Sequence, residues 1–138
     1  MTNKEFLQQA YYLDLRIEND IEELRRLRAM VTDISPPKLG DRVQTSHPGE
    51  APFVRGVEKI LLLEKKITSE IEALTALKRQ IPDAIEAVPD PNERMVLYYR
   101  YIERMTWESI GAKLYASERT VRRWHENGLL HLKQPENS

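Results

Sequence analysis

The sequence predicts an all-α protein in which a long N-terminal antiparallel helical hairpin precedes a C-terminal three-helix unit of the helix-turn-helix type. Two long segments, about 3–31 and 54–81, repeat apolar residues every three or four positions, as a helix with one buried face does. Three shorter segments follow residue 90, and each begins with a residue that commonly caps a helix. The 138 residues suffice for one domain or two small units.

The composition excludes several classes of protein. Cysteine is absent, which removes disulfides, thiol catalysis and cysteine-ligated zinc. The longest aliphatic run, 60–63, is far too short for a membrane span, and the first residues lack the apolar stretch of a signal peptide. We therefore expect a cytoplasmic protein with no membrane partner. The spacing of His47, His125 and His131 does not fit a metal site, and no residue constellation indicates catalysis, so we expect no enzyme, no cofactor and no metal.

Residues 1–89 are predicted to form the helical hairpin, which serves oligomerisation or partner binding. Its two apolar stripes are Ala10, Leu13, Ile17, Ile21, Leu24, Leu27 and Val31, and then Val57, Ile60, Leu63, Ile67, Ile71, Leu74, Leu77 and Ile81. Because neither stripe can stay exposed, the helices should pair within one chain as a hairpin or between two chains as a coiled coil. We favour the hairpin and expect a homodimer through these helices.

Proline and glycine mark the limits of the two long helices. Residues 32–53 hold four prolines and two glycines, and we predict a mobile loop there. Pro82 is expected to end the second helical pattern or to begin a short turn, because proline lacks an amide donor.

Residues 90–134 are predicted to form the helix-turn-helix unit, followed by a polar tail at 135–138. Asp90 can cap a helix that runs to about residue 105, Pro91 suits its first position, and Glu93 would complete a capping box. The next helix, 107–114, begins after Thr106, and the last one begins after Ser117 and extends to about residue 133.

Packing requirements of a helix-turn-helix are met within this unit. Gly111 lies where two helix axes should cross closely, and the last helix has an inward stripe made of Val121, Trp124, Gly128, Leu129 and Leu132. Tyr115 and Ala116 form the turn between the helices. A positive φ at Tyr115 would cost on the order of 1 kcal/mol.

The outward face of the last helix is the candidate DNA-binding site. Residues 113–133 hold five basic and two acidic side chains. Arginine can donate a two-pronged hydrogen bond to guanine, a carboxylate can accept from cytosine, and lysine can hold a phosphate. The predicted DNA-binding residues are Lys113, Ser117, Glu118, Arg119, Thr120, Arg122, Arg123 and Lys133. His125 is expected to touch a phosphate or to pack near Trp124.

Four segments carry a family resemblance, namely 93–101 (ERMVLYYRY), 106–114 (TWESIGAKL), 117–124 (SERTVRRW) and 129–132 (LLHL). Residues 92–133 resemble region 4 of the sigma-70 family, which reads the -35 promoter element. The whole chain is similar to small sigma-like proteins of phages and prophages of Gram-positive bacteria, including ArpU/RinA-type late regulators. The resemblance implies that Glu118, Arg119, Arg122 and Arg123 face double-stranded DNA, and that Ser117 and Thr120 contact the DNA backbone or cap the helix.

The resemblance also has departures. The turn usually holds glycine where this chain has Tyr115, and Trp124 fills a slot that a smaller aliphatic residue usually takes. The sigma regions that melt promoters are not visible, so a stand-alone initiating sigma factor is not expected.

The expected function is sequence-specific transcriptional regulation of phage or prophage genes, with late genes favoured and host RNA polymerase as a candidate second partner. A small-terminase-like DNA-packaging factor is an alternative, since it too joins a helix-turn-helix to oligomerising helices. A non-DNA adaptor that binds RNA polymerase or a sigma factor is another. The operator, the sign of regulation and the stoichiometry stay open.

Overall fold

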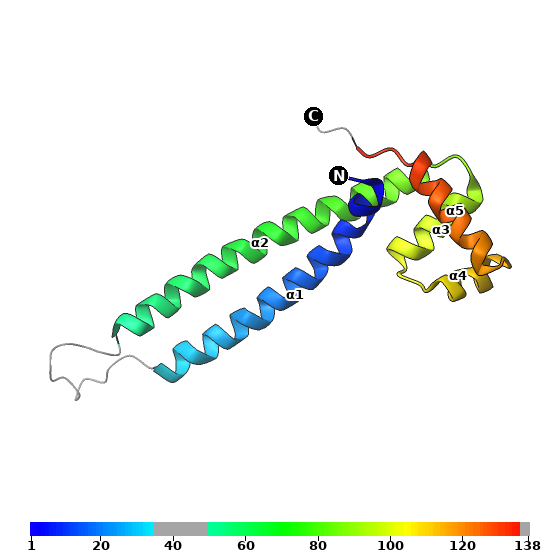
Figure 1. Ribbon diagram of the computed structural model, residues 1–138. Helices are drawn as coiled ribbons and strands as arrows, with labels where there is room; N and C mark the ends of the chain where they lie inside the picture. The colour runs from blue at the N-terminus through cyan, green and yellow to red at the C-terminus, as the bar shows by residue number, and fades with distance from the viewer. Residues whose placement is uncertain (35–49, 136–138) are drawn as a thin grey trace, which may run out of the picture. The chain divides into compact units, whose positions relative to one another are not determined.

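The computed structural model describes residues 1–34 and 50–135, and the described chain is built of helices (Figure 1). They are α1 (Asn3–Ile34), α2 (Glu50–Glu86), α3 (Pro91–Leu97), the π-helical turn η2 (Tyr98–Ile102), α4 (Trp107–Leu114) and α5 (Glu118–His131). The all-α prediction is confirmed. Within the described ranges, no helix is both long enough and apolar enough to cross a membrane.

Contacts divide the chain into two compact units. The hairpin unit is Leu13–Ala73, and the composite unit joins Met1–Tyr12 to Leu74–Ser138. The first turns of α1 and the end of α2 therefore belong with the C-terminal helices. The sequence placed a boundary between residues 89 and 90, whereas the packing groups residues 1–12 and 74–89 with the helix-turn-helix.

The hairpin unit pairs the two long helices in antiparallel order. Ile17, Leu24 and Ile67 are buried along their seam. Cross-helix ion pairs follow the same register, with Arg28 Nη2 3.1 Å from Glu64 Oε1 and Lys66 Nζ 3.3 Å from Asp20 Oδ2. These contacts fit the predicted hairpin within one chain.

Two residues of the predicted stripes lie at the margin of that seam. Ile21 and Ile71 are 41% and 46% exposed. Each predicted stripe has the density of about two residues in seven that a pair of helices needs, but a single partner helix covers a stripe from one side only, so residues at its edge stay partly in contact with solvent. The stripes therefore predicted the helices correctly and overestimated the burial of Ile21 and Ile71.

The loop prediction for residues 32–53 was too long at both ends. α1 continues to Ile34, and α2 already begins at Glu50. Pro52 fits in the first turn of α2 because an amide at that position has no partner within the helix. The rest of the predicted loop, 35–49, and the tail residues 136–138 lie outside the described residues.

The prediction that Pro82 ends the second helix was wrong. α2 passes through Pro82 and reaches Glu86. An internal proline costs about 3 kcal/mol or more. Here Ile81 and Ile85 are each only 2% exposed, and Ala84 is buried beside them. Burying several apolar side chains offsets that cost, at roughly 1.5–3 kcal/mol for each large one.

The composite unit has two buried clusters that hold the C-terminal helices. The first combines Phe6, Leu7, Ile81, Ala84, Ile85, Val88, Leu97 and Leu132. The second combines Val96, Ile110 and Val121, with Trp107 and Trp124 among the partly buried side chains around it. Residues from the first turns of α1 and from the end of α2 thus pack against the buried faces of α3 and of the chain that follows α5.

The helix predicted to run to residue 105 ends earlier. α3 changes at Tyr98 into η2, which ends at Ile102, and Arg104 has a φ of 57°. A left-handed residue cannot continue a right-handed helix. The chain therefore cannot resume the helix after Glu103, the C-cap of η2, and it turns at Arg104, two residues before Thr106, the cap of α4.

Candidate DNA-binding site

Three side chains cap the N-termini of the helices of the site, as the sequence predicted. Asp90 Oδ1 accepts hydrogen bonds from the backbone N–H groups of Asn92 and Glu93, at 2.9 and 3.0 Å. Thr106 accepts from Ser109 N at 3.1 Å, and Ser117 accepts from Thr120 N at 3.2 Å. Each cap satisfies N–H groups that have no partner within the helix.

The capping box predicted at Asp90 is only half formed. Glu93 is 6% exposed, and its Oε1 lies 2.6 Å from His131 Nδ1. The carboxylate therefore links α3 to the end of α5 instead of returning to the cap. This bond fixes the C-terminal end of the candidate recognition helix.

The turn between α4 and α5 is as tight as the sequence indicated. A Cβ atom on Gly111 would lie 2.8 Å from the carbonyl oxygen of Ala116. Gly111 also accepts a hydrogen bond from Ala116 N at 3.0 Å. Tyr115 has φ 52° and ψ 45°. It therefore has the positive φ for which we predicted a cost in free energy.

The inward face of α5 contains the predicted residues and one more. Val121 is fully buried, Gly128 and Leu132 are buried, and Trp124 and Leu129 are partly buried. His125 is also buried, at 4% exposed, with its Nε2 2.7 Å from the Tyr101 hydroxyl and its ring edge-on to Trp107. Of the two roles expected for His125, a phosphate contact and packing near Trp124, its burial rules out the phosphate contact and leaves packing.

Burial sets the protonation of this internal pair. Loss of solvent lowers the pKa of His125 from its ordinary value, an effect that Glu126 opposes in part. Burial also raises the pKa of Tyr101 to about 12. Both groups are therefore neutral near pH 7, and they join η2 to α5.

The structure brings most of the predicted site to one exposed turn and helix. Lys113, Ser117, Glu118, Arg119, Arg122, Arg123 and Lys133 are exposed, and Thr120 is half-buried. Ser117 and Thr120 share a hydroxyl–hydroxyl bond of 3.0 Å beside the cap, so they take the capping role that was one of their two expected roles. Lys133 follows the end of α5 at His131, at the opposite end from Arg119.

The predicted arginines are not equivalent. Arg122 Nη2 lies 2.8 Å from Glu118 Oε1, and its guanidinium stands 5.0 Å from the Trp107 ring centroid. This contact with the chain's own acid counts against Arg122 and Glu118 as free base readers, although an exposed pair contributes only about 0–1 kcal/mol. Among the described residues, Arg119 and Arg123 have no ion-pair partner.

Sequence reasoning missed a second group of basic and aromatic residues. Arg100 stands 4.2 Å over the Trp107 ring and donates to the Met105 carbonyl at 2.9 Å. Arg104 stands 4.9 Å over the Tyr11 ring. The four-residue spacing of the two arginines was visible in the sequence, but the contribution of α1 was not.

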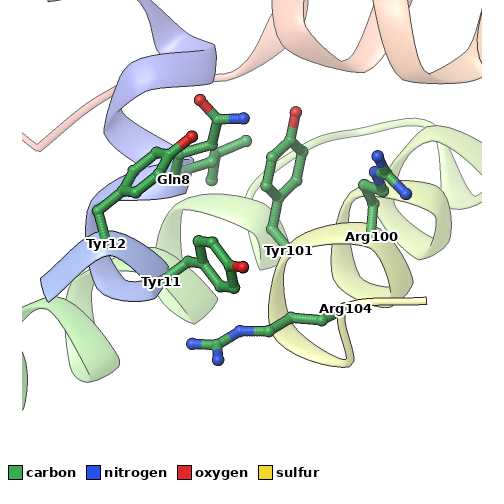
Figure 2. A pocket seen from close by; sticks show the side chains of 7 residues that line it. Gln8, Tyr11, Tyr12, Arg100, Tyr101 and Arg104 are labelled. Atoms are coloured by element: carbon green, nitrogen blue, oxygen red, sulfur yellow. The ribbon is translucent and has the colours of Figure 1, made fainter. Parts of the chain in front are cut away.

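A pocket of about 290 Å³ opens at this second group. Figure 2 shows Gln8, Tyr11 and Tyr12 on α1 across from Arg100, Tyr101 and Arg104. Leu7 completes the lining. The pocket lies wholly in the composite unit.

Comparison with known proteins gives one family match. Residues 90–134 match the family described as "Sigma-70, region 4". No curated protein and no solved structure matches the chain. Residues 90–134 are therefore similar to Sigma-70 region 4, a helix-turn-helix type of domain, and the match ends one residue after Lys133.

Proposed function

We propose that this protein is a sequence-specific DNA-binding transcriptional regulator that inserts α5 into a major groove. The observation that carries the proposal is the exposed basic face of α5, held on a buried apolar frame within a Sigma-70 region 4 segment. Arg119 and Arg123 are the first candidates for base edges, because both are exposed without an acidic partner in the described chain. No catalytic role is proposed.

Arg122 and Glu118 have a conditional role in this proposal. Their weak surface pair can open when DNA supplies competing acceptors and donors. Lys113 and Lys133 are exposed and would add phosphate contacts that do not read sequence.

The biological setting rests on the resemblance of the whole chain to phage and prophage regulators. We propose control of phage or prophage genes, late genes in particular, in the cytoplasm of a bacterium. Host RNA polymerase is a proposed second partner, since sigma region 4 works together with polymerase. Genome-wide occupancy of the tagged protein would give the operator and its neighbouring genes together.

The hairpin unit supports a proposed homodimer. Leu61 and Leu62 on α2 are 59% and 68% exposed, and Leu62 also lines an open groove of about 390 Å³ with Leu27 and Leu63. Large apolar side chains grouped on one surface are typical of protein interfaces. Light scattering should give a dimer that Leu62→Glu weakens. A ring of eight or more subunits would instead favour the packaging factor.

Arg123→Ala should weaken binding to a duplex selected from a random pool by about 1–3 kcal/mol and relax specificity, if Arg123 contacts a base edge. A mobility shift at fixed salt measures the affinity. The matched control is Arg79→Ala, which removes the same charge from an exposed part of α2 in the composite unit. Equal affinity of Arg119→Ala, Arg123→Ala and the parent protein would refute the α5 interface.

A further inference from the structure

Four charged side chains meet inside the seam of the hairpin unit. Arg16 and Asp20 stand one turn apart on α1. Lys66 and Glu70 stand one turn apart on α2. Lys66 Nζ lies 3.3 Å from Asp20 Oδ2, and Arg16 Nε lies 3.8 Å from Glu70 Oε2. Each of these ion pairs therefore crosses from one helix to the other.

The two acids lie next to isoleucines that the sequence assigned to the seam. Ile21 and Ile71 stay at its exposed margin, whereas the side chains of Asp20 and Glu70 are only 15% and 10% exposed. The hairpin thus contains a polar layer, although each helix has an isoleucine beside the acid. Replacing buried ion pairs by apolar side chains is often neutral or stabilising. Stability alone therefore does not explain this layer.

The carboxylate of Glu70 lacks a hydrogen-bond donor within the described chain. Both of its oxygens are shielded from solvent and accept no hydrogen bond, and the same is true of Asp20 Oδ2. Arg16 Nε, at 3.8 Å, is beyond hydrogen-bonding distance, and the Arg16 side chain is 66% exposed, so that solvent screens its charge. A buried carboxylate in such surroundings tends to become neutral.

A proton on Glu70 supplies the missing donor. The Asp20 and Glu70 carboxyl groups are hydrogen-bond partners across the seam. Two ionised carboxylates only accept, so a bond between them requires a proton on one of them. Lys66 Nζ donates to Asp20 Oδ1 at 3.4 Å and thereby favours the ionised form of Asp20. Glu70 is therefore the group that holds the proton and donates.

The protonation equilibria of the two acids agree with this geometry. Burial has the largest effect on Glu70 and raises the pKa of its carboxyl group above the ordinary 4.5, and Asp20 raises it further. The bond with Glu70 has the largest effect on Asp20 and lowers the pKa of that carboxyl group below 3.8. Lys66 and Arg16, which face the pair from the two helices, lower both pKa values without outweighing the burial of Glu70.

We propose that Glu70 and Asp20 share one proton across the seam, so that the pairing of α1 with α2 in the hairpin unit responds to pH. With the proton in place, the pair carries one negative charge beside two cations. When rising pH removes the proton, two negative charges face each other in a layer that holds little water, and the seam weakens. This proton site lies in the hairpin unit and does not depend on the proposed binding of DNA by α5.

The two acids give the pH dependence opposite signs at its two ends. Folding favours protonated Glu70, so its contribution to stability is fully present below 4.5 and is lost as pH rises through the higher folded pKa. Folding favours ionised Asp20, so its contribution is present above 3.8 and is lost as pH falls through the lower folded pKa. The hairpin unit should therefore be most stable at acidic pH between the two folded values.

The first test is a carbon-13 NMR titration of the full chain, labelled at its side-chain carboxyl carbons. The Glu70 signal is identified by its absence in Glu70→Gln, and we expect its midpoint above 4.5. Asp20→Asn should lower that midpoint, because the asparagine amide donates to the Glu70 carboxylate and the like charge is gone. A Glu70 midpoint at or below 4.5, or one that Asp20→Asn leaves unchanged, would overturn the proposal.

The second test compares urea midpoints of the parent, Glu70→Gln and Glu72→Gln at about pH 5 and about pH 8.5. A glutamine amide at position 70 donates to Asp20 at every pH, so Glu70→Gln should exceed the parent at the higher pH, and the excess should shrink at the lower pH. Glu72→Gln removes an equal charge from an exposed position of the same unit and should follow the pH dependence of the parent. His125 titrates in all three proteins, so its contribution cancels. An excess that is equal at both pH values would refute the shared proton.

A divalent cation is the other occupant that two carboxylates can bind. Arg16 and Lys66 already supply the balancing positive charge, so we expect magnesium or calcium chloride to leave the urea midpoint of the parent unchanged relative to Glu70→Gln. Stabilisation of the parent alone by either salt would assign the pair to a metal ion and overturn the proposal.

Discussion

At the scale of single residues, Tyr115 shows a conflict between backbone and side chain. Its φ of 52° is one that glycine adopts readily and tyrosine does not, and its side chain is 97% exposed. Packing therefore does not compensate for the strain.

Tyr115→Gly should stabilise the protein by about 1 kcal/mol, because it removes the left-handed penalty and loses almost no burial. Chemical denaturation followed by circular dichroism measures the change. Tyr115→Ala serves as the control, since it removes the ring and keeps the strain. A glycine variant that unfolds more easily than the alanine variant would contradict this account.

His125 is the residue through which pH should act on the composite unit. Burial lowers its pKa in the folded state, so folding favours the neutral ring. The resulting stability is fully present above the unfolded value of 6.5 and is lost as pH falls through the lower folded pKa.

The free energy of unfolding should therefore fall on acidification from about pH 7.5 to about pH 5.5. His125→Gln keeps a polar side chain beside Tyr101 and should flatten this dependence. Denaturant midpoints of both proteins at the two pH values provide the measurement. Parallel pH profiles would exclude His125 as the titrating group.

At the scale of elements, the starts of helices were more predictable than their ends and their burial. Asp90, Thr106 and Ser117 were identified because a cap is a local arrangement of a few consecutive residues. The continuation of α2 through Pro82 was not predictable, since it depends on contacts of Ile81 and Ile85 with distant residues. The exposed face of α5 was predictable from its period.

Parts of the site needed three-dimensional information. His125 lies four residues after Val121, so its period indicated the inward face, but its polarity favoured an outward role. The pairing of Arg122 with Glu118 is an ordinary contact at a spacing of four residues that could have been noticed. The pocket could not be predicted from the sequence, because Tyr11 and Tyr12 are almost ninety residues away from Arg100.

Two glycines of the helix-turn-helix should respond differently to alanine. Alanine gains about 1 kcal/mol in helix propensity at either position. At Gly111 the new Cβ would meet the Ala116 carbonyl at 2.8 Å, and this backbone oxygen cannot rotate away. At Gly128 it would lie 3.1 Å from Cδ1 and 3.2 Å from Cγ of the Leu97 side chain, which has to move by a few tenths of an ångström.

Gly111→Ala should therefore destabilise the protein by about 1–2 kcal/mol after the gain in propensity is included, because overpacking typically costs about 1–3 kcal/mol and a clash with a backbone atom falls in the upper part of that range. Gly128→Ala should stay within about 1 kcal/mol of the parent. Thermal unfolding compares the two variants directly. The opposite order would show that the turn yields more easily than the Leu97 side chain.

At the scale of the whole molecule, the N-terminus supports the DNA-binding candidate. Leu7 is 1% exposed in the cluster that also contains Leu97 and Leu132. Asn3 donates to the carbonyl oxygens of Leu129 and Leu132, at 2.6 and 3.0 Å, and thereby caps the end of α5. The segment that matches Sigma-70 region 4 therefore has packing partners outside the matched residues.

Leu7→Ala should destabilise the composite unit by about 2–5 kcal/mol, as large-to-small changes in a closed core do, and should weaken duplex binding as α5 loses support. Arg79→Ala is the control, because that side chain is exposed in the composite unit and its truncation should cost about 0.5 kcal/mol or less. Urea unfolding and mobility shifts report the two effects. Equal stability of both variants would show that the N-terminal turns are dispensable.

The cap that Asn3 places on α5 joins residues separated by 126 and 129 positions. Chain regions that far apart meet slowly, because a long loop must close before their contacts form. During synthesis on a ribosome, residues 13–73 can pair their helices while α5 has not yet been made. The apolar side chains in the first turns of α1 then stay without their packing partners at the end of α5 until those residues have been made. The surface proposed to read DNA is therefore completed last.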